Sequence, residues 1–98
     1  MKYLSVNIYH NGDVDNELVN LSLGEGDVVL WRNPHQYPFT VSFPSNPFQN
    51  GPTFIVPGRS DLPSGPLKTS VQAGDEYDYL VQNTEMALAS DPGIIIKP

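Results

Sequence analysis

The stretch GDVVLWRNPHQYPFTVSF, residues 26–43, decides the fold of this chain. It holds two short apolar runs, residues 28–33 and 39–43, rich in the β-branched and aromatic side chains that favour strands. Pro34 and Pro38 interrupt the pattern between them, and proline is poorly accommodated inside a sheet. The stretch therefore predicts two strands joined by a polar loop that carries His35.

The same pattern of short apolar runs between turn residues extends over the whole chain. Ten prolines and eight glycines in 98 residues argue against a helical protein, since an interior proline costs a helix about 3 kcal/mol. Residues 86–89, MALA, are long enough for one helical turn only. Alternation and turn signals predict the remaining strands at residues 4–8, 18–23, 67–71, 77–81 and 93–97. We predict an all-β fold: one domain, residues 1–98, built as a Greek-key β-sandwich of about seven or eight strands.

Residues 44–66 differ from their surroundings because six of the ten prolines lie there. Within this Pro/Gly-rich excursion, residues 53–56 (TFIV) can pair only at a sheet edge, because prolines flank them. Phe48 and the apolar side chains of TFIV supply enough hydrophobic surface to hold the excursion against the body of the domain.

Charge and composition exclude several classes of function. The net charge is −6, with 11 acidic and 5 basic residues, so we expect no binding to nucleic acid or to an anionic membrane surface. The absence of cysteine excludes disulfides, thiolate nucleophiles and iron–sulfur clusters. No apolar run resembles a secretory signal or a membrane span. We expect a cytoplasmic protein if Met1 is the natural start.

The polar residues form no catalytic or metal-binding motif. His35 and His10 lie in turns, 25 positions apart, and a metal would need further ligands. The acidic cluster at residues 11–17 lacks the glycine and glutamate spacing of a calcium loop and fits a solvated hairpin turn. In GDEYDY, residues 74–79, Glu76 and Asp78 share a strand face that we expect to be solvated. We therefore expect no enzyme.

Aromatic side chains offer another kind of site, because an exposed ring can stack on a sugar or a peptide. Tyr9, Tyr37 and Trp31 are the candidates. Strand alternation leaves open which face of residues 28–33 points inward, although a tryptophan in a sandwich strand usually belongs to the core. Tyr37, which lies in the loop, is the better candidate for a surface contact.

The order of motifs resembles the cupredoxin fold of plastocyanin-like proteins over nearly the whole chain. GDVVLW (residues 26–31), PFTVSF (residues 38–43) and AGDEYDYLV (residues 73–81) carry the resemblance. The resemblance implies a copper centre, which in that family is held by two histidines, a cysteine thiolate and a weak methionine ligand.

At each of the implied ligand positions the chain carries another residue: Phe39, Val81, Thr84 and Ala89. Met86 lies near the last position but is a poor substitute, since the other ligands are missing. We expect Phe39 to fill the former copper cavity with Val81 beneath it, and we expect neither copper nor another cofactor.

Two functions follow from these expectations. The first is a metal-free, cupredoxin-like module without catalytic activity, which binds a protein partner or a second copy of itself. Its contact surface would include His35, Tyr37, Phe39 and Met86. The alternative is a small-ligand or carbohydrate-binding module that uses the exposed aromatic rings. A divergent metal-binding protein using His10 and His35 is a more distant alternative.

Overall fold

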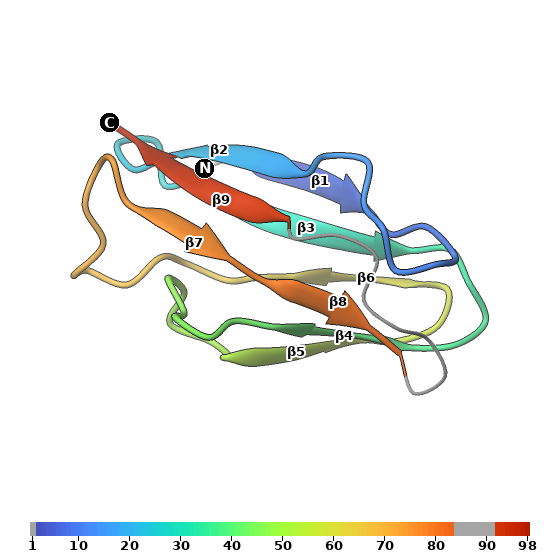
Figure 1. Ribbon diagram of the computed structural model, residues 1–98. Helices are drawn as coiled ribbons and strands as arrows, with labels where there is room; N and C mark the ends of the chain where they lie inside the picture. The colour runs from blue at the N-terminus through green and yellow to red at the C-terminus, as the bar shows by residue number, and fades with distance from the viewer. Residues whose placement is uncertain (1, 84–91) are drawn as a thin grey trace.

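Residues 2–83 and 92–98, which the computed structural model describes, form an all-β fold (Figure 1). These residues contain no helix, and so no apolar helix that could cross a membrane. The strands are β1 (Tyr3–Asn7), β2 (Leu18–Ser22), β3 (Val28–Asn33), β4 (Phe39–Ser42), β5 (Thr53–Val56), β6 (Ser60–Pro63), β7 (Glu76–Asp78), β8 (Leu80–Gln82) and β9 (Gly93–Lys97).

The strands pair into three small sheets, in the orders β1-β3-β6, β2-β9-β7 and β5-β4-β8. Only Tyr79 separates β7 from β8, so the second and third sheets join along one continuous ribbon (Figure 1). Together they form a layer that faces β1-β3-β6, and the fold is a β-sandwich. β1 pairs with β3, and β2 with β9, in parallel, whereas the other strand pairs are antiparallel.

The strand predicted at residues 77–81 is divided by a change of partner. β7 pairs with β9, and β8 pairs with β4. Between them the amide of Tyr79 donates to Pro92 O at 3.0 Å, outside both ladders. The solvated face predicted for Glu76 and Asp78 is confirmed, because both residues are exposed while Tyr79 and Val81 are buried.

The prediction of a strand at residues 67–71 is wrong, and the structure has a strand that was not predicted, β6, shortly before this segment. Leu67 forms only an isolated bridge with Phe48. β6 has the sequence SDLP, which shows little apolar pattern, yet Leu62 pairs with Trp31 of β3. Pro63 ends this edge strand, where a missing N–H is tolerated. β6 is thus identified as a strand by its pairing with β3 and not by an apolar pattern of its own.

The core is centred on an aromatic cluster around Trp31. Its ring lies 5.0 Å from that of Phe54 and 6.2 Å from that of Phe48, between ring centroids. Phe43 and Tyr79 complete the cluster at 6.0 and 5.9 Å. These distances suit tilted and edge-to-face packing, which adds about 0.5–1.5 kcal/mol per pair beyond burial.

The Pro/Gly-rich excursion is docked, as predicted, because it supplies two rings of this cluster. Phe48 is fully buried, and Phe54 is 6% exposed. β5 lies at a sheet edge, next to β4 only, so the edge prediction for TFIV is confirmed. Ile55 is the exception, since 63% of its surface is exposed.

The segment expected to form a hairpin turn, residues 11–17, does contain a turn, but it does not connect two paired strands. Gly12 adopts φ +86°, and the amide of Tyr9 donates to Asp13 O at 2.8 Å. β1 and β2, on either side of this segment, belong to different sheets. The turn therefore makes only a local bridge between Ile8 and Val14, and the segment crosses the sandwich at one end.

Candidate functional site

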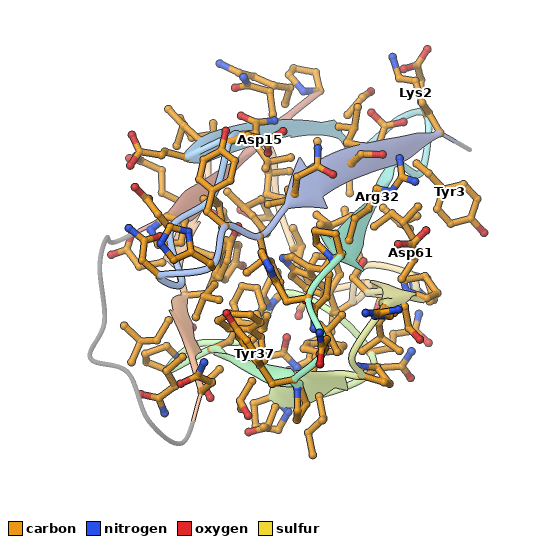
Figure 2. All side chains as sticks on the ribbon, turned by 90° about the vertical axis from the view of Figure 1, so that its right-hand side faces the viewer. Lys2, Tyr3, Asp15, Arg32, Tyr37 and Asp61 are labelled. Carbon is orange, nitrogen blue, oxygen red and sulfur yellow. The ribbon has the colours of Figure 1, made fainter. Side chains whose placement is uncertain are left out.

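Three connecting segments meet at one end of the sandwich, on the right in Figure 1 and facing the viewer in Figure 2. They are residues 8–17, 34–38 and 57–59, which follow β1, β3 and β5. We call the exposed part of residues 35–37, together with Arg59, the loop-end surface.

Asn33, at the end of β3, holds two of these segments together. It is 2% exposed, and its Nδ2 donates to Tyr37 O at 2.8 Å and to Pro57 O at 3.1 Å. Its Oδ1 accepts the amide of His35 at 3.0 Å. One buried side chain thus fixes the backbone on both sides of the loop-end surface.

His35 is held in place by its own ring. Its Nε2 donates to Ile8 O at 2.9 Å, which connects the loop to the end of β1. The ring stacks on Tyr37, with centroids 5.6 Å apart and planes 9° from parallel. His35 is therefore not merely solvated, because its ring supports that of Tyr37. Tyr37 is 39% exposed, and its hydroxyl donates to His10 O at 3.3 Å.

Phe39 and Val81, which occupy two of the implied copper-ligand positions, lie on paired strands. Val41 is the partner of Val81, and Phe39 lies two residues away on the same face of β4. Both side chains are fully buried. Gly12 covers them: a Cβ placed there would lie 3.2 Å from Val81 O and 3.9 Å from Phe39 Cε1. Hydrocarbon groups therefore fill this part of the sandwich.

The burial of Phe39 corrects one part of the predicted contact surface. Phe39 contacts the His35 ring edge-on and the Tyr37 ring at a tilt, at centroid distances of 5.8 and 5.4 Å, and supports the surface without being part of it. Met86, Thr84 and Ala89 lie outside the described residues.

Trp31 cannot stack on a ligand at the surface, because it is fully buried. Among the described residues, neither its Nε1 nor the hydroxyl of Tyr79 has a hydrogen-bond partner. Burial raises the pKa of Tyr79 to about 12, and the Asp15 carboxylate adds to that rise. The nearby indole N–H of Trp31 lowers the pKa of Tyr79 in part, although Trp31 Nε1 and the Tyr79 hydroxyl do not reach hydrogen-bond geometry. Tyr9, 47% exposed, and Tyr37 remain at the surface.

Four of the acidic residues accept hydrogen bonds from backbone amides: Asp13, Asp15, Asp27 and Asp75. Asp15 accepts from the backbone amide and the side-chain Nδ2 of Asn7, at 2.9 and 2.7 Å, which pins the segment after β1. Asp75 accepts from the Tyr77 hydroxyl at 3.2 Å. Burial and this carboxylate raise the pKa of Tyr77. Among the described residues, no three His, Cys, Asp or Glu side chains are grouped so that they could hold a metal ion.

Arg59 is the residue of this end that the sequence did not single out. Its φ is +54°, in the left-handed region that side chains other than glycine rarely adopt. Its amide donates to His35 O at 2.7 Å. Gly58 makes this approach possible, since a Cβ at that position would collide with the Gln36 carbonyl. The pair Gly58-Arg59 after Pro57 signalled a turn, but not what the turn lies against.

Two open hollows of about 380 and 440 Å³ adjoin at this end and share Pro34 and Arg59. The second is the loop-end surface itself. The first, which we call the arginine hollow, is lined by Asn7, Arg32, Asn33, Pro34, Arg59 and Asp61. In it Arg32 Nε lies 3.5 Å from Asp61 Oδ2, and Figure 2 shows the two side chains next to each other.

Comparison with known proteins adds no family to these observations. No family model matches the chain, and no curated protein matches it.

Proposed function

We propose that this chain is a metal-free, cupredoxin-like binding module that contacts a protein partner or a second copy of itself through the loop-end surface. The observation that carries the proposal is the complete burial of Phe39 and Val81 on neighbouring strands. In a copper protein of the family these positions would supply an imidazole and a thiolate. Here they supply hydrocarbon, which cannot coordinate a metal.

The loop-end surface supports a role in binding. Tyr37 offers a partly exposed ring whose position is fixed from three sides, by His35, Phe39 and the Asn33 side chain. A rigid exposed tyrosine loses little conformational entropy when a partner covers it, which is why tyrosines are common anchors of interfaces.

Site-specific photocrosslinking tests this proposal. With p-benzoylphenylalanine in place of Tyr37, we expect a defined crosslinked product, either with a partner protein or as a covalent dimer. The same probe at Tyr3 is the matched control, because Tyr3 is 53% exposed and lies away from Tyr37 (Figure 2). Equal crosslinking from both positions, or none from position 37, would contradict the proposal.

A copper titration tests the metal-free part separately. We expect Cu(II) to bind no more tightly than to an H10Q/H35Q variant, because Phe39 and Val81 contribute no donor atoms. Isothermal titration calorimetry on both proteins gives the comparison. Tight stoichiometric binding that requires both histidines would support the divergent metal-binding alternative instead.

A small-ligand or carbohydrate-binding module is the second candidate. The hollow of about 440 Å³ beside Tyr37 and Gln36 supports it, because it places a ring next to a side-chain amide. Screening a sugar array with the wild type and a Y37A variant tests this candidate. Hits that Y37A retains, or an array without hits, would argue against it.

A further inference from the structure

We propose that the arginine hollow binds a carboxylate of a peptide ligand, with Arg59 as the main contact and Arg32 beside it. This inference rests on the proposed function, since it names the chemical group that the binding module recognises next to its loop-end surface. Three independent features support it: the placement of the arginines, the backbone conformation of Arg59, and the charge balance of the hollow.

The first feature is where the chain places its arginines. It carries 5 basic residues against 11 acidic ones, and only Arg32 and Arg59 are arginines. Both line this one hollow, although 27 residues separate them in the sequence. The planar guanidinium matches a carboxylate through two parallel hydrogen bonds, which the ammonium of lysine cannot do.

The second feature is the conformation of Arg59. A left-handed backbone is unfavourable for a residue with a side chain, and such strain is concentrated at binding and catalytic sites. Here the strain places a guanidinium at the junction of both hollows, while Asn33 and the His35 carbonyl fix the backbone around it. Among the described residues, no acidic group forms an ion pair with Arg59. Its charge is therefore available to a ligand.

The third feature is the charge balance, which selects a monoanion. Arg32 is already paired with Asp61 at 3.5 Å, so the two largely cancel. Arg59 leaves one uncompensated positive charge among the lining residues. A carboxylate neutralises that charge. A phosphate dianion would instead leave one uncompensated negative charge in the hollow.

Titrations followed by backbone amide chemical shifts test the assignment. The probes are the peptide acetyl-Gly-Glu-Gly-amide, its neutral counterpart acetyl-Gly-Gln-Gly-amide, sodium acetate and inorganic phosphate, at constant ionic strength. We expect saturable shifts at residues 32–37 and 57–61 with the Glu peptide and with acetate, but none with the Gln peptide. Loss of one charge-assisted contact weakens binding by about tenfold.

Two variants make the test specific. R59G removes the guanidinium and suits the left-handed backbone, so it should fold and bind the Glu peptide about tenfold more weakly. K68Q removes the same charge from a residue outside the hollow, in the segment that binds Pro47 O, and should bind like the wild type. Equal weakening in both variants would mean a general charge effect and would overturn the proposal.

Three further results of the titrations would overturn the assignment of a peptide carboxylate. Saturation by phosphate at these residues, as tight as by acetate, would overturn the assignment to a carboxylate. Binding of acetate without binding of the Glu peptide would overturn the peptide as its source. Failure of every carboxylate, combined with specific crosslinking from position 37, would reject this inference while leaving the proposed function intact.

Discussion

Arg59 uses a backbone conformation that glycine would adopt at lower cost. The left-handed region costs a residue with a side chain about 1–2 kcal/mol, whereas glycine loses about 0.5–1 kcal/mol more backbone entropy on folding. We expect R59G to raise the free energy of unfolding by about 0.5–1 kcal/mol, measured by urea denaturation. R59A is the control, since alanine keeps the strain. A stabilised R59A, or a destabilised R59G, would show that side-chain contacts and not strain dominate at this position.

Tyr79 buries a hydroxyl that finds no partner among the described residues. An unsatisfied buried polar group costs about 1–3 kcal/mol. Y79F should therefore raise the free energy of unfolding by roughly 1 kcal/mol, measured by chemical denaturation. Y77F is the matched control, because the Tyr77 hydroxyl donates to Asp75 and its removal should destabilise slightly. A loss of stability in Y79F would reveal a hydrogen bond to this hydroxyl.

Because the Tyr79 hydroxyl is buried, the free energy of unfolding depends on pH in the alkaline range. The pKa of Tyr79 rises from its ordinary value of 10.0 to about 12 in the folded protein. Between these values the unfolded chain releases the proton while the folded chain retains it, so ionisation of this group leaves the free energy of unfolding unchanged below pH 10 and lowers it as the pH rises toward 12. We expect this group to lower stability by at most about 1.4 kcal/mol per pH unit. Denaturation curves between pH 9 and 11.5 measure the slope, which Y79F should reduce.

At the scale of elements, the turn after β5 is set by its contact with the loop after β3. Gly58 lies against the Gln36 carbonyl, where a methyl group has no room. G58A should destabilise by roughly 2 kcal/mol, as overpacked sites do, and shift the amide resonances of residues 34–37. G24A is the control: its added Cβ would lie 3.8 Å from the nearest neighbouring atom, so we expect little change. Equal effects of the two substitutions would contradict the tight packing of this turn.

Comparison of the strands shows that a local sequence pattern predicts which side chains point inward but not which strands pair. Alternation predicted the inward side chains of the segment around Tyr79 and Val81, because a strand presents successive residues to opposite faces wherever it pairs. It did not predict that Tyr79 marks a change of partner, since both halves keep the same periodicity. β6 was missed for a related reason: only Leu62 is apolar in SDLP, and its strand conformation depends on pairing with β3.

At the scale of the whole molecule, the Pro/Gly-rich excursion belongs to the core. Phe48 is fully buried against Trp31 and Phe43. F48A should cost about 3–5 kcal/mol, which is comparable to the total stability of many small domains. We expect one cooperative thermal transition at a much lower midpoint, measured by calorimetry. I55A is the control, since Ile55 is exposed. A small loss in F48A would mean that the excursion can detach while the sandwich stays folded.

Some parts of the candidate site could be predicted from neighbouring residues, whereas others depend on contacts between distant segments. The loop holding His35 and Tyr37 could be predicted because prolines and polar residues interrupt two apolar runs. That Phe39 and Val81 come together could be expected only through the family resemblance, since 42 residues separate them. Nothing local in the sequence indicated that Arg59 would lie against His35 or share a hollow with Arg32.

By itself the sequence determined that this chain is all-β, where its Pro/Gly-rich excursion lies, and that Glu76 and Asp78 share the exposed face of their segment. These properties follow from neighbouring residues, because turn chemistry and side-chain alternation act over a few positions. Only the tertiary structure decided that β6 pairs with β3, that Tyr79 divides two strands, and that both arginines line one hollow. Strand partners and their register depend on contacts between distant segments, and these are settled only when the two layers enclose a common core.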